Sequence, residues 1–315
     1  MDSLILAVNV VIPLFLLMAL GYILNITHML DDKTLSVLNK LVFKVFLPAL
    51  LFNNMYRTNI AAAVQPGLIL YATVAVVLVA VFMFIVVPLM EKDNAKRGVI
   101  IQGIFRSNFV LFGIPVATAI LGENNVGVTS VLIAIVVPLF NILAVITLEF
   151  FRGGSFTAKK ILVMIKGVFT NPLILSSLVG IIFLLLGIKL PKPLETTIGD
   201  VSKLATPISL IVLGGTFKFR RVSGNIKQLG IMLFGKLIFY PCVVILPALK
   251  LGFTGAAIVS LLSMTASPAA VSSYTMAEEM GSDGELAGQG VVLSTAFSII
   301  TVFVFVLVLN EMGAF

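Results

Sequence analysis

The sequence reads Asn108-Phe-Val-Leu-Phe-Gly113-Ile114-Pro115 inside one apolar run, at about 98–121, and Ser263-Met-Thr-Ala-Ser267-Pro268-Ala269 inside another, at about 255–280. Proline has no backbone N–H and its ring clashes with the carbonyl four residues earlier, so each run predicts a broken helix. In lipid, a break is tolerated only where protein or a water-filled cavity satisfies the freed backbone groups. Two such breaks, one in each half of the chain, therefore predict a polar site inside a membrane.

The composition of the whole chain is that of a membrane protein. Of its 315 residues, 59% are hydrophobic and 11% charged, and the mean hydropathy is +1.16. Ordinary soluble domains carry about 25% charged residues, and a bilayer core is crossed by about 20 apolar residues. We therefore predict an all-α integral membrane protein with ten transmembrane helices. The predicted spans are 4–25, 34–55, 66–90, 98–121, 126–150, 168–188, 196–217, 228–250, 255–280 and 287–310.

Residue types that serve enzymes and metal sites are scarce. Cys242 is the one cysteine and His28 the one histidine, which excludes a disulfide framework and a cysteine-rich metal site. The HExxH, GxSxG and Walker A motifs do not occur. We expect no enzyme, no cofactor, and no ATP-driven pump in this chain alone. Met1-Asp2-Ser3 lacks the positive charge of a cleavable signal peptide.

The distribution of Lys and Arg predicts the orientation. With the N-terminus outside, the inner loops hold 12 basic residues and the outer loops four. Cytoplasmic loops carry the basic excess in membrane proteins, so both termini are expected outside the cell membrane. The net charge of +7 is thus a topology signal and does not indicate a nucleic-acid partner.

An internal repeat relates the two halves of the chain. Five residues recur in the second half at an offset of 159 positions. The pairs are Pro13 and Pro172, Gly21 and Gly180, Lys44 and Lys203, Pro48 and Pro207, and Pro88 and Pro247. We predict two repeats, 1–150 and 168–315, joined by a basic cytoplasmic linker at 151–167. Five spans per repeat is an odd number, so the second repeat is inverted.

The two predicted breaks offer the ends of half-helices to a ligand. These ends carry unbonded N–H and C=O groups, and an N-terminal end binds anions well. If the breaks of spans four and nine cross at the middle of the membrane, backbone from both repeats surrounds one small site. Ordinary proline kinks are the alternative. The residues of the predicted crossover are Gly113, Ile114, Pro115, Ser267, Pro268 and Ala269.

Five basic residues lie inside predicted spans: Lys40, Lys44, Arg106, Lys203 and Lys236. A charge at that depth costs about 2.5–3.5 kcal/mol on insertion scales and is a functional candidate by default. Snorkelling is the alternative for Lys40, and a helical ion pair with Asp200 is the alternative to an ion site for Lys203. Lys44 and Arg106 remain candidates for binding an anion, and an ion pair or a position at the membrane interface is the alternative for Arg106.

Asn108 and the surplus of positive charge also favour an anion. The Asn108 amide is able to donate to a carboxylate, and an interhelical hydrogen bond is the alternative. Carboxylates inside the spans are scarce, with Asp200 inside a span and Glu149 at a span end. A cavity with surplus fixed positive charge selects anions.

Four segments together resemble the auxin efflux carrier family, which includes plant PIN-FORMED carriers and bacterial malate or malonate permeases. The resemblance covers nearly the whole chain. Its motifs are Leu38-Asn39-Lys40-Leu41-Val42 with Phe46-Leu47-Pro48, Asn108-x4-Gly113-Ile114-Pro115-x-Ala117-x-Ala119-x2-Gly122, Asn171-Pro172, and Pro268 with Ala277-Glu278.

The resemblance implies a dimerising scaffold of spans 1, 2, 6 and 7 and a moving transport domain of spans 3–5 and 8–10. It also implies that Asn108, Pro115 and Pro268 line an organic-anion site. The long cytoplasmic loop of plant carriers is missing here, which indicates a bacterial-type member. Arg106 matches no residue of the plant carriers, which favours a more strongly anionic substrate than auxin.

We therefore predict a secondary transporter of small organic anions, mono- or dicarboxylates such as malate, that works as a homodimer by alternating access. The alternatives are a cation-coupled symporter that uses Asp200 and a carrier of auxin-like aromatic acids. The missing motifs disfavour an intramembrane enzyme, and the paired breaks disfavour a channel.

Overall fold

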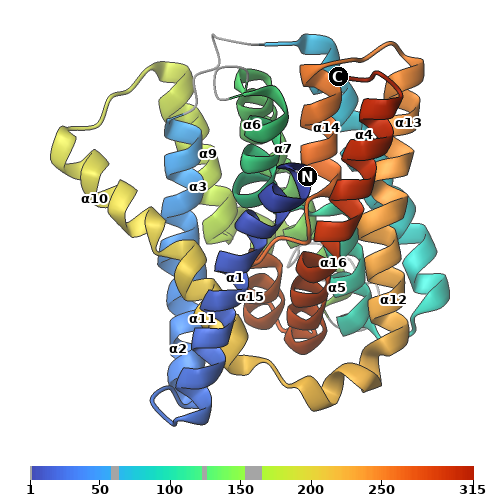
Figure 1. Ribbon diagram of the computed structural model, residues 1–315. Coiled ribbons are helices and arrows are strands. Elements are labelled where there is room, and N and C mark those ends of the chain that lie inside the picture. Colours follow the sequence, from blue (N-terminus) through green and yellow to red (C-terminus); the bar gives the residue numbers. More distant parts are fainter. Residues whose placement is uncertain (1, 58–63, 123–125, 153–164) are drawn as a thin grey trace.

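The computed structural model describes residues 2–57, 64–122, 126–152 and 165–315, and within them the secondary structure is helical without a named strand (Figure 1). Six helical segments are long and apolar enough to cross a membrane, and four shorter apolar helices accompany them. The prediction of an all-α protein with membrane-spanning helices is thus confirmed for the described residues.

The described residues of the first half form seven α-helices and two short π-helical turns. These are α1 (Asp2–Ile26), α2 (Asp32–Leu41), η1 (Val42–Phe46), α3 (Leu47–Tyr56), α4 (Pro66–Met90), α5 (Asn94–Phe105), η3 (Phe109–Gly113), α6 (Ile114–Leu121) and α7 (Gly127–Phe151).

The described residues of the second half are also helical. They form α9 (Pro172–Leu186), α10 (Lys192–Lys203), α11 (Ala205–Thr216), η5 (Phe219–Asn225), α12 (Ile226–Phe234), η6 (Gly235–Phe239), α13 (Tyr240–Lys250), α14 (Ala256–Ala266), α15 (Ser272–Glu279) and α16 (Gly284–Glu311). The linker predicted at 151–167 lies mostly outside the described residues.

Polar side chains begin four of these helices. Asp31, Asp93, Asn171 and Asp283 accept hydrogen bonds from the first-turn N–H groups of α2, α5, α9 and α16. Such caps satisfy donors that the first helical turn leaves unbonded. These four loop residues therefore stabilise the starts of α2, α5, α9 and α16.

An apolar stripe along α4 faces outward. Its members recur every three or four residues and are 44–82% exposed. They are Leu70, Val74, Leu78, Val81, Ile85 and Leu89. A stripe of this size on one helix face is unfavourable in water and favourable against lipid.

Two close helix pairs join the halves: α1 packs on α11, and α3 packs on α9 (Figure 1). Gly21 lies against the backbone of Ile211, and Gly180 lies against Phe52 and Met55, so a Cβ at either glycine would overlap its neighbour. Small residues permit such close approach of helices in membranes. Gly21 and Gly180 differ by 159 positions, and so do their neighbours Phe52 and Ile211.

The first predicted break lies earlier than expected. Helix α5 ends at Phe105, residues 106–108 are not helical, and helix resumes at Phe109. Pro115 instead lies in the first turn of α6, directly after the π-helical turn η3. The prediction that the helix breaks at Gly113-Ile114-Pro115 was wrong, because a π turn lets a helix pass a proline with a kink.

The second predicted break is where proline indicated it. Helix α14 ends at Ala266 and α15 begins at Ser272, with Pro268 between them. The centres of the two breaks, Ser107 and Ala269, differ by 162 positions. Pro115 lies beyond the first break and Pro268 lies inside the second, so the two prolines do not occupy equivalent places in the two breaks.

Candidate functional site

The two helix breaks pair with each other. The N–H of Asn108 donates to the carbonyl oxygen of Pro268 (2.8 Å), and the N–H of Ala270 donates to that of Arg106 (3.3 Å). Ser107 and Ala269 face each other in an antiparallel bridge. These bonds satisfy backbone groups that the broken helices leave free, which a break inside a membrane requires.

The four half-helices meet at this paired segment, which we call the crossover (residues 106–108 and 267–271). Figure 1 shows α6 and α14 in the upper half of the view and α5 and α15 in the lower half. The first turns after each break, beginning at Phe109 and Ser272, border a common cavity. Helix N-termini carry partial positive charge, so the cavity receives positive potential from both halves of the chain.

The cavity beside the crossover has a volume of about 70 Å³. A site of about 10–15 Å³ on this measure holds one water molecule, so the cavity has room for several waters or a small ligand. Its polar lining comes from α3, the first break, α7, α11 and α15. The polar lining residues are Asn54, Arg106, Ser107, Asn108, Asn141, Thr206, Ser209 and Ser272.

Arg106 is the one charged residue that lines this cavity. Its side chain is 3% exposed, and its guanidinium donates to Asn141 Oδ1 (2.6 Å) and Ser272 Oγ (2.8 Å). It also contacts Met276 Sδ at 2.7 Å. None of the four ion pairs found among the described residues includes Arg106. A buried cation held only by neutral groups is costly and favours an anionic ligand.

Two asparagine side chains that line the cavity have amide donors without a hydrogen-bond partner. The Nδ2 groups of Asn108 and Asn141 are buried and have no hydrogen-bond partner within the described structure. Both side chains are under 10% exposed, at 7% and 2%. An unpaired buried donor costs about 1–3 kcal/mol, and a carboxylate, which only accepts, would satisfy both.

Lys236 is a second buried basic residue at the crossover. It is 0% exposed on η6, and its Nζ donates to Ser107 Oγ and to the carbonyl oxygen of Thr265 (3.2 Å). The ring of Tyr240 lies 4.9 Å from the same atom. The sequence marked Lys236 as one of five basic residues inside spans, but nothing in its spacing indicated that it reaches the crossover.

Of the predicted site residues, Arg106 and Asn108 line the cavity. Their binding role stays a prediction. The sequence analysis did not predict Asn141 or Ser272 as site residues. The only signal for Asn141 was the presence of an asparagine inside span five.

Seven other predicted site residues lie in the described part of the chain but do not line the cavity. They are Gly113, Ile114, Pro115, Ser267, Pro268, Ala269 and Lys44. Gly113 packs against the ring of Phe109 and the backbone of Ser263. Ser267 and Ala269 are held by bonds to the Ser263 carbonyl and to Ser294 Oγ. These residues therefore hold the backbone of the crossover in place without bordering the cavity. Lys44 is exposed on η1.

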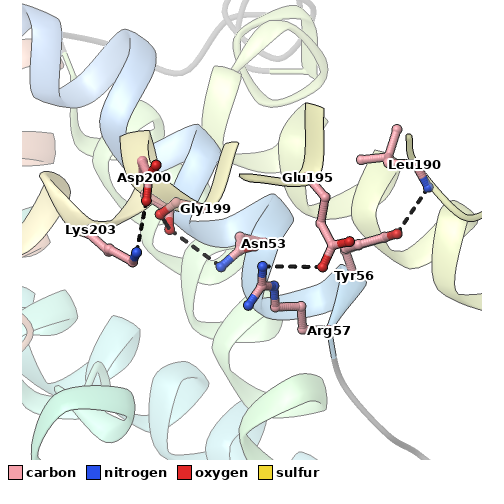
Figure 2. A network of polar contacts seen from close by, with 9 residues as sticks. Asn53, Tyr56, Arg57, Leu190, Glu195, Gly199, Asp200 and Lys203 are labelled. Atoms are coloured by element: carbon pink, nitrogen blue, oxygen red, sulfur yellow. Dashed lines mark hydrogen bonds and ion pairs between the residues drawn. The ribbon is translucent and has the colours of Figure 1, made fainter. Parts of the chain in front are cut away.

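Asp200 and Lys203 form an ion pair on the exposed face of α10. Their charged atoms are 2.8 Å apart, and their side chains are 63% and 76% exposed. Figure 2 shows the pair beside a second one, between Arg57 and Glu195. The helical ion pair, one of the two interpretations of this spacing, is the one that the geometry favours. Exposed pairs of this kind contribute little to stability.

The described residues contain no group of three or more His, Cys, Asp or Glu side chains able to hold a metal ion. The crossover instead gathers cationic and neutral donors around a small cavity. Its chemistry suits binding of a small anion.

Similarity to known proteins identifies the class of this chain, the membrane transport proteins. A family model described as "Membrane transport protein" matches residues 6–306. The chain belongs to this family, the auxin efflux carrier family that the sequence motifs indicated. It is also 25% identical over 295 residues to an "Uncharacterized transporter" of Methanothermobacter thermautotrophicus strain Delta H, which covers 92% of this chain and 94% of the relative. It is 24% identical over 306 residues to a protein named "Putative malonate transporter" of Rhizobium meliloti strain 1021, with 93% of each chain covered.

Proposed function

We propose that this protein is a secondary transporter of small organic anions, which it binds in the cavity beside the crossover. The observation that carries the proposal is the surplus of donors there: the Arg106 guanidinium and the open amides of Asn108 and Asn141 have no carboxylate partner. A carboxylate has two oxygens with about four acceptor sites, which is enough in number for all three groups. Mono- or dicarboxylates such as malate are the proposed substrates, and the relative named for malonate supports a short dicarboxylate.

The proposed architecture is two inverted repeats of five spans each. Two features support it: the glycine contacts of Gly21 and Gly180 follow the 159-residue offset, and the hydrogen bonds of the crossover follow an offset of 162. An approximate twofold axis in the membrane plane would produce both. Both termini would then lie outside the cell membrane.

Alternating access is the proposed mechanism, with two bodies that move relative to each other. Spans 1, 2, 6 and 7 would form a scaffold that dimerises with a second copy, and spans 3–5 and 8–10 would carry the crossover past it. The cavity lies between these groups, because α3 and α11 line one side and the crossover lines the other. The α1–α11 and α3–α9 contacts would keep the scaffold together.

The alternatives lack a supporting contact. Asp200, the residue proposed for cation coupling, pairs with Lys203 at the surface of α10. The cavity of about 70 Å³ gives no support to the alternative of a carrier for auxin-like aromatic acids, which are larger than short dicarboxylates.

Flux into proteoliposomes tests the proposal. A carrier saturates with substrate and shows counterflow, in which an internal unlabelled anion drives uptake of the labelled one. A channel shows neither, and an enzyme changes the substrate chemically. A thermal-shift screen of organic acids comes first, since a ligand at 100 times its Kd stabilises the folded protein by about 2.7 kcal/mol. Absence of counterflow with every stabilising acid would refute the proposal.

A further inference from the structure

A second cavity lies between the proposed scaffold and the proposed transport body. Its volume is about 250 Å³, against about 70 Å³ for the cavity beside the crossover. Helices α2 and α11 form one wall, and α15 with the first turns of α16 forms the other (Figure 1). The described lining residues of the two cavities do not overlap. The second cavity is therefore a separate space, which we call the acidic cavity.

The charged lining of the acidic cavity is mainly negative. Asp32, Glu278 and Glu285 supply three carboxylates, and Lys218 is the one basic residue among the described lining residues. Glu285 pairs with Arg221 at 2.7 Å. None of the four ion pairs in the described part of the chain includes Asp32 or Glu278. Two carboxylates therefore remain for a cationic ligand.

Asn39 gives this cavity a buried acceptor that has no donor. Its side chain is 1% exposed, lines the cavity and donates from Nδ2 to Glu279 Oε1 (3.1 Å). Its Oδ1 has no hydrogen-bond partner within the described structure. A buried polar group without a partner costs about 1–3 kcal/mol. An ammonium group has three donors and no acceptor, so it is the kind of group that this oxygen requires.

The acceptors are spread along the cavity. Asp32, Leu35 and Asn39 line it from one face of α2, which matches the spacing of residues on a helix face. Asp32 and Asn39 are thus about 10 Å apart along the helix axis, with the apolar Leu35 between them. Leu213 and Phe217, at the end of α11, add further apolar surface. A ligand with two cationic ends and an apolar middle matches this arrangement.

A metal ion matches it less well. The described residues contain no group of three or more acidic, cysteine or histidine side chains that could hold one. The volume of about 250 Å³ is also many times the 10–15 Å³ that holds one water molecule on this measure. The cavity thus has room for an organic ligand of several atoms.

We propose that the acidic cavity binds an aliphatic diammonium compound. The Asn39 oxygen receives one ammonium group, the carboxylates receive the other, and the apolar side chains contact the methylene chain between them. Binding of this ligand does not depend on the transport function proposed above.

Such a ligand would join the two proposed bodies at the cytoplasmic ends of their helices. Two hydrogen bonds already connect these walls: the one from Asn39 to Glu279, and one from Thr216 Oγ1 to the Tyr274 hydroxyl (2.9 Å). A ligand that binds both walls favours the state in which they are in contact. The diammonium compound is therefore an inhibitor of alternating access, and this consequence rests on the proposed function.

Titration calorimetry of the purified protein tests the binding. The probes are straight-chain diamines of two to eight carbons, with amino groups at both ends, and the matching monoamines, all at one ionic strength. We expect one optimal chain length, at which the diamine binds about tenfold or more tightly than the monoamine. Equal affinity for all the diamines would overturn the inference, because attraction to a screened acidic surface does not select chain length.

Variants of the lining locate the site. Asp32→Asn and Glu278→Gln remove a charge with little change of shape, and each should weaken binding of the optimal diamine by about fivefold. Glu311→Gln, the matched control, alters an exposed carboxylate outside the cavity and should leave the affinity unchanged. Asn39→Leu should abolish the advantage of the diamine over the monoamine. If Asn39→Leu does not fold, the carboxylate variants decide, and parental affinity in both would overturn the inference.

Counterflow in proteoliposomes separates this inference from the proposed function. The optimal diamine on the cytoplasmic side should slow counterflow by the parent by about fivefold or more, and should have less effect on the Asp32→Asn and Glu278→Gln proteins. The expected binding pattern in a protein without counterflow for any organic acid would keep the diammonium site and refute transport. Counterflow that a saturating diamine does not slow would refute the inhibition and leave transport intact.

Discussion

The two breaks of the crossover share a backbone pattern and differ in side chains. The first break, Arg106-Ser107-Asn108, is polar and has no proline, whereas the second, at 267–271, contains Pro268 followed by two alanines and a valine. Their reciprocal backbone bonds are nearly symmetric, since Asn108 pairs with Pro268 and Ala270 with Arg106. The comparison shows that both halves build the geometry of the site, while the one charged residue that lines the cavity, Arg106, comes from the first half.

The largest effect is expected from removing that charge. Arg106→Gln should weaken binding of a short dicarboxylate by about 100-fold or more, because loss of one partner from a buried charged contact costs about 2–5 kcal/mol. Titration calorimetry on purified, folded protein measures the affinity. Arg106→Lys keeps the charge and serves as the matched variant, with a smaller loss. Equal affinity in the parent and in Arg106→Gln would show that the first break does not select the anion.

The next effect concerns the open amide of the same break. Asn108→Ala should weaken binding by about ten- to hundredfold, since a hydrogen bond to a charged group contributes about 1.5–3 kcal/mol. The symmetric substitution Ala270→Ser in the second break adds a small polar group without removing a donor. Its affinity should stay within about threefold of the parent. The same calorimetric titration measures both affinities. An equal loss of affinity in the two variants would contradict the inference that the first break supplies the binding groups.

Substitution of the two prolines, Pro115 after the first break and Pro268 inside the second, compares how much each one contributes to transport. Pro268→Ala should slow counterflow by about tenfold, because it places a new N–H in a buried, non-helical segment at a cost of about 1–3 kcal/mol. Pro115→Ala should change counterflow by less than about threefold, since Pro115 lies within continuous helix and alanine favours helix. Initial rates in proteoliposomes measure both. A larger effect at Pro115 than at Pro268 would restore the sequence-based assignment of the first break.

The smallest effects are expected outside the crossover. Lys44→Ala and Lys203→Ala remove exposed lysines at equivalent positions of the two halves. Neither should change the affinity for a dicarboxylate by more than about twofold, and loss of the exposed Asp200–Lys203 pair should alter stability by no more than about 1 kcal/mol. Affinity and Tm check both variants. A selective loss of dianion binding in Lys44→Ala would bring that residue back into the site.

Much of the fold was accessible to sequence reasoning because it depends on local patterns. Apolar runs of about 20 residues predict helices in a membrane wherever they occur, and helices occupy each predicted run in the described residues. Pro268 marked the second break correctly. Pro115 misled, because a proline forbids one hydrogen bond but does not say whether the helix ends or passes it through a π turn.

The candidate site was accessible only in part. Arg106 and Asn108 stood out as polar residues in an apolar run, and both line the cavity. Asn141 and Lys236 lie in other spans, and their relation to the break depends on how the helices pack. The exposed position of Lys44 likewise follows from the rotation of its helix, which a lysine in an apolar segment does not reveal.

The sequence by itself determined that this chain is a helical membrane protein of the transport family, with a break in each half. Hydrophobic length, charge bias and motifs suffice for that, because they act through local contacts with lipid and water. Only the tertiary structure decided that Ser107 meets Ala269, that Arg106 has no acidic partner among the described ion pairs, and that Lys236 reaches both breaks. These contacts join residues more than 100 positions apart in some cases, and helix packing brings them together.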